Sequence, residues 1–178
     1  MNKISKNRWI LVTLGHYILL FSLSQLNHYL APVHTYLTLI GLAISYSVIR
    51  LSLKQGLLSL IPIAFYLDCT TPLIFGTSLL MIVSLFCTMF LFRSRFQRET
   101  ITTSIFISLI LNSAMISAYT ISAISQFGYD SVNISLTLWN LLWSSLVIVL
   151  IHQLYYHLID SLLARFGIHI AEEQREAK

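Results

Sequence analysis

The chain of 178 residues has little charge: only 10% of its side chains are Asp, Glu, Lys or Arg, whereas 56% are hydrophobic. Soluble domains carry about 25% charged and roughly 45–50% apolar residues. The two cysteines are too few for a disulfide framework. No charged residue occurs in four long stretches, 9–49, 69–92, 100–129 and 131–159. Each can cross a bilayer, which takes about 20 apolar residues as a helix, so the composition predicts an integral membrane protein.

Motifs that carry catalysis or bind cofactors are also missing. The sequence contains no phosphate-binding Gly-Lys-Ser/Thr loop, no His-Glu-x-x-His, no Gly-x-Ser-x-Gly and no Cys-x-x-Cys. His152 and His157 would diverge by about 140° around a helix, so they do not present two ligands to one metal ion. We therefore expect no catalytic, cofactor or metal site, and no enzymatic activity.

The apolar stretches predict an all-α membrane protein with six transmembrane helices. The stretch 9–49 would be about 60 Å long as one helix, twice the hydrocarbon thickness, so it must turn back, and Asn27, His28 and Pro32 mark that turn. Polar tails at 1–8 and 167–178 are expected to flank a membrane domain at 9–166. The expected spans are 9–26, 33–53, 55–68, 72–92, 101–124 and 134–158.

The third and fourth spans have special features. The third is short and contains Pro62, so a re-entrant segment is the alternative to a full crossing. For the fourth, Thr71 is expected as the N-cap and Pro72 as the first helical residue, where its missing N–H costs nothing.

The eleven basic residues predict the orientation. They form four clusters: Lys3, Lys6 and Arg8; Arg50 and Lys54; Arg93, Arg95 and Arg98; Arg165, Arg175 and Lys178. With six spans all four clusters lie on one face, which the distribution of Lys and Arg in membrane proteins assigns to the cytoplasm. Both termini are then cytoplasmic. The net charge of +4 reflects this topology and a rim for anionic lipids, not a nucleic-acid partner.

A few polar residues inside the apolar stretches are candidates for function. Asp68 either anchors a partner or ligand at the outer surface, or stabilises the positive end of the following helix. His16 is expected to form a hydrogen bond between helices rather than to relay protons. Asn140 is expected to pack inward, within an aromatic belt of Trp139 and Trp143.

Small residues spaced four apart let membrane helices approach closely. Ser104 and Ser108 in the fifth span, and Gly41 and Ser45 in the second, have this spacing. They serve either packing inside the bundle or a surface for a partner helix.

The region around Asp68 resembles the signature of the MreD family of rod shape-determining membrane proteins. Gly56-Leu57-Leu58 leads to Ala64-Phe65-Tyr66-Leu67-Asp68, and Gly76 follows eight residues after the acid. The basic loop of Arg93, Arg95 and Arg98 follows, as in that family. The resemblance covers about 40 residues. The sequence departs from the family pattern at Ala64, Thr71-Pro72 and Pro62.

The resemblance implies a non-enzymatic scaffold in the bacterial cytoplasmic (inner) membrane, within the cell-elongation machinery. Such a scaffold holds an MreC-like single-pass protein and, through it, connects MreB-like filaments to peptidoglycan synthases. Asp68 and Gly76 are the family-like positions, and Asp68→Ala is expected to weaken recovery of the partner.

The alternative is the substrate-binding component of an energy-coupling-factor vitamin transporter, whose six-helix bundle MreD proteins resemble. Its polar pocket would be built from Asp68, Asn112, Asn140 and His16. However, the first helix lacks the Ala-x-x-x-Ala pattern by which that class docks its coupling partner.

Overall fold

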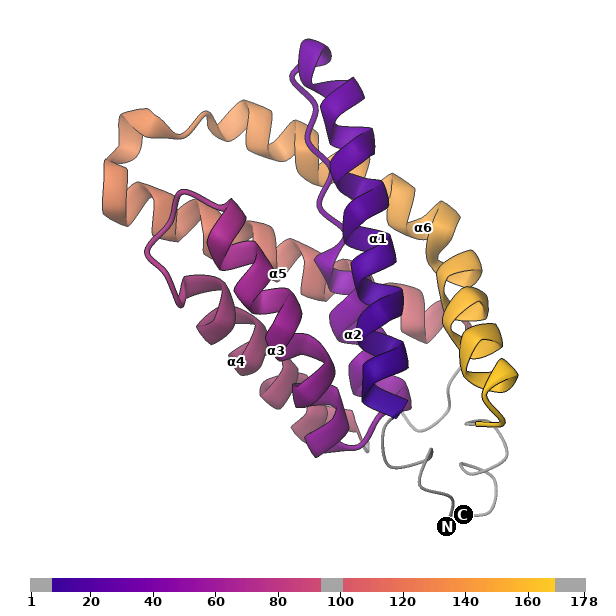
Figure 1. The fold of residues 1–178 in the computed structure, drawn as a ribbon. Helices are drawn as coiled ribbons and strands as arrows, with labels where there is room; N and C mark the ends of the chain where they lie inside the picture. The colour runs from indigo at the N-terminus through magenta and orange to yellow at the C-terminus, as the bar shows by residue number, and fades with distance from the viewer. Residues whose placement is uncertain (1–7, 94–100, 169–178) are drawn as a thin grey trace.

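A computed structural model describes residues 8–93 and 101–168, and in these ranges all regular structure is helical. The six α-helices run alternately in opposite directions, so that α1 begins and α6 ends at the same end of the molecule (Figure 1). This confirms the all-α fold. The helices are α1 (Arg8–Leu30), α2 (Ile40–Arg50), α3 (Leu53–Thr70), α4 (Thr77–Phe92), α5 (Ile101–Phe127) and α6 (Ile134–Arg165).

Three of the described helical segments are long and apolar enough to cross a membrane. They are Arg8–Val33, which is α1 with the following 3₁₀ turn, Ile101–Phe127 and Ile134–Arg165. Helices α2 and α4 are shorter but also apolar. These lengths and compositions are those of a membrane protein.

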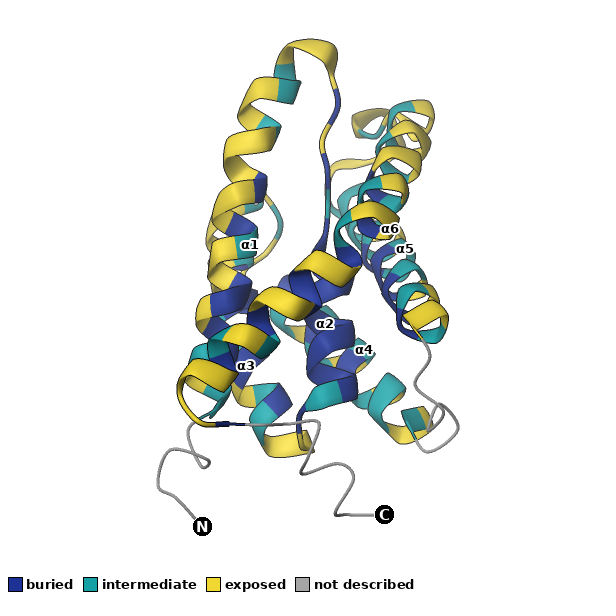
Figure 2. Ribbon diagram, turned by 90° about the vertical axis from the view of Figure 1, so that its right-hand side faces the viewer, coloured by how far each residue is buried: buried dark blue, intermediate teal, exposed yellow. Residues whose placement is uncertain are grey.

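Helix α2 forms the centre of the bundle, and every residue from Ile40 to Ile49 is buried (Figure 2). It packs most closely on α5. A Cβ atom added to Gly41 would lie 2.4 Å from the carbonyl oxygen of Ser108 and 2.6 Å from the amide nitrogen of Asn112. A side chain of any size would therefore separate the two helices. The small residues of α2 and α5 are used for packing inside the bundle.

The first two spans differ from their expected limits. Helix α1 continues past Asn27 and His28 to Leu30, and the chain turns at Ala31–Val33, which contains Pro32, one of the three residues expected to mark the turn. His34 completes this turn with a φ of 52°. The expected continuous helix over 33–53 is wrong in its first half, because residues 35–39 lie outside any helix and are drawn out between α1 and α2 (Figure 2), and α2 begins only at Ile40.

The region between the third and fourth spans also differs. Helix α3 is continuous over 18 residues with Pro62 inside it, and the chain does not reverse within it. The expected start of the fourth helix at Thr71 and Pro72 is wrong. The backbone N–H of Thr71 instead closes the end of α3 by donating to the Leu67 carbonyl oxygen at 2.9 Å, and α4 begins at Thr77.

The last two helices begin as expected but extend further. Helix α5 continues to Phe127, and α6 continues for 32 residues to Arg165. The side chain of Asn133 caps α6 by accepting a hydrogen bond from the N–H of Leu136 at 3.1 Å.

Candidate functional site

Asp68 and Gly76 together form the cap of α4. The Asp68 carboxylate accepts hydrogen bonds from the backbone N–H groups of Ser78 at 2.7 Å and Leu79 at 3.3 Å. Gly76 has a φ of 95°, which glycine adopts without strain from a Cβ atom. This turn directs the free amides of the first turn of α4 toward Asp68. The family-like spacing of the acid and the glycine is therefore the spacing of a helix cap.

The surroundings of Asp68 agree with the second of its two expected roles, stabilisation of the helix that follows it. The side chain is 5% exposed, and both carboxylate oxygens have backbone partners. A carboxylate at this position also faces the positive end of the α4 dipole. Nearby, the Tyr119 hydroxyl on α5 donates to the Ser78 hydroxyl at 2.9 Å, which joins α5 to the same turn.

The extended segment, residues 35–39, is bound on one side by α1. The side-chain oxygen of Asn27 accepts from the N–H of Leu37 at 2.8 Å, and its NH₂ group donates to the Leu37 carbonyl oxygen at 2.9 Å. One amide side chain thus replaces both partners that Leu37 would have in a regular helix or sheet. The end of α1 and the extended segment are held together by this pair.

Helix α6 binds the other side of the extended segment. The side-chain oxygen of Asn140 accepts from the N–H of Tyr36 at 3.0 Å, and the Ser144 hydroxyl accepts from the N–H of Thr38 at 2.9 Å. The indole N–H of Trp139 donates to the hydroxyl of Thr35 at 3.1 Å. Asn140, which the sequence singled out, therefore faces the bundle and stabilises non-helical backbone.

A second polar layer joins α2, α5 and α6. The side-chain oxygen of Asn112 accepts from the N–H of Gly41 at 3.3 Å. One turn away, the hydroxyls of Ser45 and Ser108 are 2.6 Å apart, and Tyr156 donates to Ser45 at 3.2 Å. Ser108 is completely buried. Its role is a contact between helices of this chain.

Ser104 lies one turn from Ser108 on α5 and is also buried. Its hydroxyl donates to the carbonyl oxygen of Ile101 at 2.9 Å, and its own carbonyl oxygen accepts from the Ser108 hydroxyl at 2.9 Å. Both groups are thus satisfied within α5.

His16 joins α1 to α6 and α2. Its Nδ1 lies 2.5 Å from the Tyr155 hydroxyl, and its Nε2 lies 3.1 Å from the Ser47 hydroxyl. The Ser47 hydroxyl lies 3.2 Å from that of Ser59 on α3. The buried imidazole has a partner at each nitrogen, which is the interhelical role expected for it.

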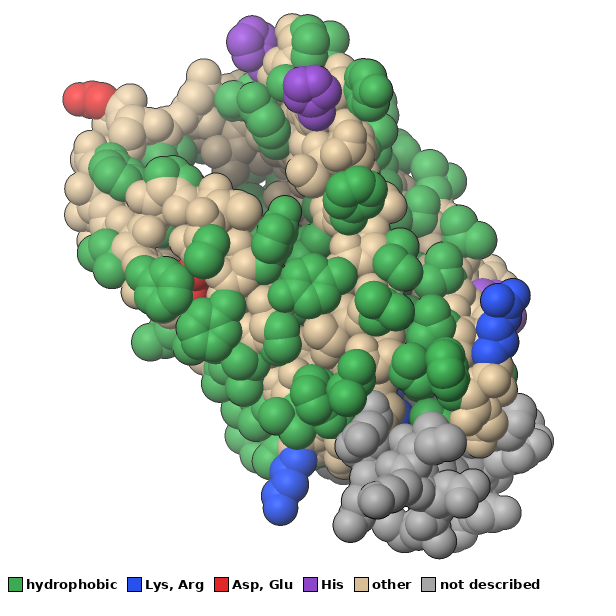
Figure 3. Space-filling view, viewed as in Figure 1, with side chains coloured by type: hydrophobic (Ala, Val, Ile, Leu, Met, Phe, Trp, Pro, Cys, Tyr) green, Lys and Arg blue, Asp and Glu red, His purple; other side chains and the backbone are tan. Residues whose placement is uncertain are grey.

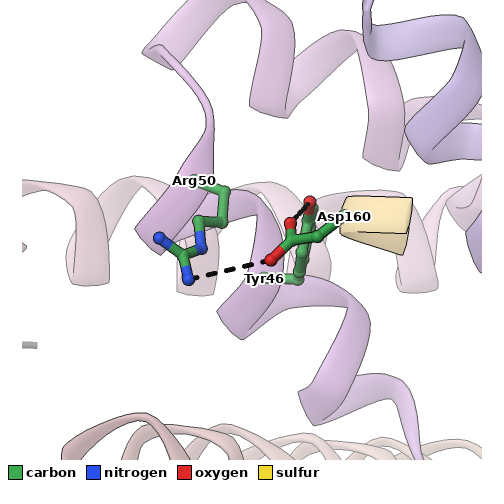
Figure 4. Close-up of polar contacts among 3 residues, drawn as sticks. All are labelled: Tyr46, Arg50 and Asp160. Carbon is green, nitrogen blue, oxygen red and sulfur yellow. Dashed lines mark hydrogen bonds and ion pairs between the residues drawn. The ribbon is translucent and has the colours of Figure 1, made fainter. Parts of the chain in front are cut away.

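A further polar group, formed by Tyr46, Arg50 and Asp160, was not predicted from the sequence. The Tyr46 hydroxyl donates to Asp160 Oδ1 at 2.7 Å, and Arg50 Nη2 lies 3.9 Å from Asp160 Oδ2 (Figure 4). Tyr46 and Asp160 are 114 positions apart in the chain, so no local pattern connects them. The group fixes the ends of α2 and α6 to each other.

Basic residues mark one end of the bundle. Arg93 follows α4 and donates to the carbonyl oxygens of Ile49 at 2.9 Å and Leu51 at 2.6 Å, at the end of α2. This places a cation at the negative end of a helix dipole. Arg95 and Arg98 lie outside the described residues. Figure 3 shows basic side chains in the lower part of the visible face and histidine side chains at its top, with further histidine atoms beside the basic side chain at the right.

An open cavity of about 500 Å³ lies at the opposite end, between the turn after α1 and the start of α6. Its lining is mainly apolar and consists of Val33, Asn133, Ser135, Leu136, Leu138, Trp139 and Leu142. The four residues of the expected transporter pocket do not line it. Asp68, Asn112, Asn140 and His16 are instead engaged at four separate places.

Two further features bear on chemistry. Among residues 8–93 and 101–168, no group of three or more His, Cys, Asp or Glu side chains is placed to hold a metal ion. Cys69 and Cys87 are free thiols, the first exposed and the second half-buried.

In comparisons with known proteins, no family model, no curated protein and no solved structure matches this chain.

Proposed function

We propose that this protein is a non-enzymatic scaffold of the bacterial cell-elongation machinery in the cytoplasmic membrane. It would hold a single-pass partner and connect cytoskeletal filaments to peptidoglycan synthesis. The stretch from Gly56 to Gly76, which resembles the MreD family, supports this proposal. Within it, Asp68 and Gly76 cooperate in one helix cap.

The observation that carries the proposal is the internal use of the polar side chains. Asn27, Asn140 and Ser144 bind the backbone of the extended segment. Asn112 also accepts from backbone, and His16 bonds to other helices. Side chains committed in this way lock the helices together. A rigid bundle with an apolar exterior suits the holding of another membrane helix better than the capture and release of a polar ligand.

The proposal includes six crossings with both termini in the cytoplasm. The 11 residues of α2 extend only about 16 Å as a helix. Residues 35–38 add up to about 13 Å at the rise of an extended chain, so together they come close to the roughly 30 Å of the hydrocarbon core. Non-helical backbone at membrane depth is tolerated where protein surrounds it, and here α1 and α6 do so.

The test is purification of the intact protein in mild detergent, followed by mass spectrometry of whatever accompanies it. A scaffold should retain a single-pass protein with a coiled-coil region, and depletion of the scaffold from cells should abolish rod shape. Cells that keep their shape, together with protein that carries no such partner, would contradict the proposal.

A second candidate is the vitamin-binding component of an energy-coupling-factor transporter. The cavity beside Val33 and Trp139 favours it, because it opens next to a broken membrane segment. The same purification separates the two candidates, since a transporter component should retain a small molecule that denaturation releases.

A further inference from the structure

Helix α2 begins inside the bundle, and its first turn is only partly capped. Leu39, at the N-cap position, makes no side-chain hydrogen bond to this turn. The N–H of Gly41 donates to Asn112 Oδ1 at 3.3 Å. The N–H of Ile40 has no acceptor among the described residues, although Ile40 is only 4% exposed. The positive end of a buried helix therefore retains a donor without a partner.

The side chain of Asn112 supplies a second donor at the same turn. Asn112 is completely buried on α5, and its Nδ2 has no hydrogen-bond partner in the part of the chain that the structure describes. Because Oδ1 and Nδ2 belong to one planar group, the contact of Oδ1 with Gly41 also holds the NH₂ group beside the start of α2. A buried donor without an acceptor is costly, so this pair of donors indicates a bound acceptor.

His152 on α6 is the third polar group at this level. It is 2% exposed, and neither ring nitrogen has a partner among the residues that the structure describes. Its ring stacks on Tyr156, with the ring centroids 4.2 Å apart, and the Tyr156 hydroxyl donates to Ser45. His152 lies one turn before Tyr156, as the first turn of α2 lies one turn before Ser45. Because α2 and α6 run in the same direction (Figure 1), the imidazole lies at the level of the start of α2.

The chemistry of these groups favours an anion. The start of α4 shows the same arrangement with the anion built in, since its first amides donate to the Asp68 carboxylate. The start of α2 has no such side chain: the other acidic residues of the described chain are Asp130, in the turn before α6, and Asp160, which binds Tyr46 toward the end of α2. Helix N-termini bind anions, and the N-terminal ends of broken membrane helices do so near the bilayer midplane.

We propose that the first turn of α2, Asn112 and His152 together bind a small monovalent anion, and we call these groups the anion site. The anion accepts hydrogen bonds from the Ile40 N–H, from Asn112 Nδ2 and from the N–H of the His152 ring. Chloride and a small carboxylate share this chemistry. The inference goes beyond the scaffold proposal and does not depend on it, because the anion stabilises the break in the second span whatever the protein holds.

The test is chloride NMR of the full-length protein in mild detergent, with chloride replaced by gluconate at constant ionic strength. Exchange with the anion site should broaden the chloride line until the site is saturated, whereas gluconate is too large to compete. Formate is then added to the chloride sample. Loss of the broadening identifies a site that also accepts a carboxylate, and persistence of the broadening identifies a site for inorganic anions.

Two substitutions assign the broadening to the anion site. His152→Phe keeps a ring to stack on Tyr156 and removes both nitrogens, and Asn112→Asp keeps an oxygen for the Gly41 N–H and removes the NH₂ donor. Each should weaken chloride binding about tenfold or more, which corresponds to one hydrogen bond to a charged group. His157→Phe, at an exposed position of the same helix, is the control and should not change it.

Thermal unfolding gives an independent measure. Chloride should raise the unfolding temperature of the wild-type protein above its value in gluconate, and should do so less in His152→Phe. In gluconate, His152→Phe should be at least as stable as the wild type, because it removes two buried nitrogens without partners.

The inference is overturned if chloride neither broadens nor stabilises, as expected where water alone occupies the site. It is also overturned if His152→Phe binds chloride as tightly as the wild type. Neither result touches the scaffold proposal, which the recovery of a single-pass partner tests separately.

Discussion

The extended segment of residues 35–39 and helix α2 follow each other directly in the chain, yet their backbone amides obtain hydrogen bonds in different ways. The amides of α2 beyond its first turn bond within the helix, and the side chains of α2 are free to pack against α5. The extended segment depends on side chains from α1 and α6, which are distant in sequence. Substitutions in α2 should therefore act through packing, and those around the extended segment through lost hydrogen bonds.

The largest effect is expected where α2 and α5 are closest. Gly41→Leu places a side chain where even a Cβ atom lies 2.4 Å from the Ser108 carbonyl oxygen. The Ser108 carbonyl oxygen and the nearby Asn112 amide nitrogen both belong to the backbone of α5 and cannot move aside. The two helices must therefore separate, and the free energy of unfolding should fall by about 3 kcal/mol or more. Thermal unfolding in detergent measures this. Ser117→Leu, at an exposed position of α5, is the control, and equal unfolding temperatures for both variants would refute the close packing.

The next effect tests the extended segment. Asn27→Leu leaves both the N–H and the carbonyl oxygen of Leu37 without their partners. The free energy of unfolding should fall by about 2–3 kcal/mol. Amide hydrogen exchange should rise in a peptide covering 35–39 and remain slow in α2.

Gln25→Leu is the matched control for Asn27→Leu, because Gln25 is exposed on the same helix. Unchanged exchange at 35–39 in the Asn27→Leu protein would show that the segment is held without this side chain. The contrast between the segment and α2 would then be lost.

Asp68→Ala tests the cap of α4, where one side chain binds two backbone amides. Removing the carboxylate uncaps Ser78 and Leu79 and should cost about 1–2 kcal/mol of unfolding free energy. Asp68→Asn keeps an acceptor oxygen and should cost less. Loss of partner recovery should then parallel loss of stability across the two variants. A variant that unfolds at the wild-type temperature but no longer retains the partner would identify Asp68 as a direct contact.

The smallest effect is expected at the end of α2. Tyr46→Phe removes the hydrogen bond to Asp160 and should lower the free energy of unfolding by about 1 kcal/mol. Tyr17→Phe is the control, because that hydroxyl bonds to the Pro62 carbonyl oxygen at an exposed site. A Tyr46→Phe protein no less stable than the Tyr17→Phe protein would show that the Tyr46 hydroxyl does not stabilise the fold.

Much of the fold was predictable because the responsible signals are local. Helix α5 begins at Ile101 and α6 at Ile134, as expected, since apolar runs bounded by polar residues predict helix ends. Asp68 was singled out as an acid between apolar stretches, with stabilisation of the following helix as one of its two expected roles, and Gly76 was singled out by the resemblance to the MreD family. That the two residues cooperate in capping α4 was not predicted. The early start assigned to α4 was wrong because Thr71 and Pro72 match a helix N-terminus locally, while the cap is made by a residue of the preceding helix.

The sequence by itself determined that this is a helical membrane protein with basic residues at alternate helix ends, because composition and periodicity act over a few turns. Only the tertiary structure decided where the polar side chains point. Asn27, Asn140 and Ser144 can bond to backbone or to one another, and the choice depends on contacts between segments far apart in the chain. Those contacts hold the non-helical half of the expected second span between α1 and α6.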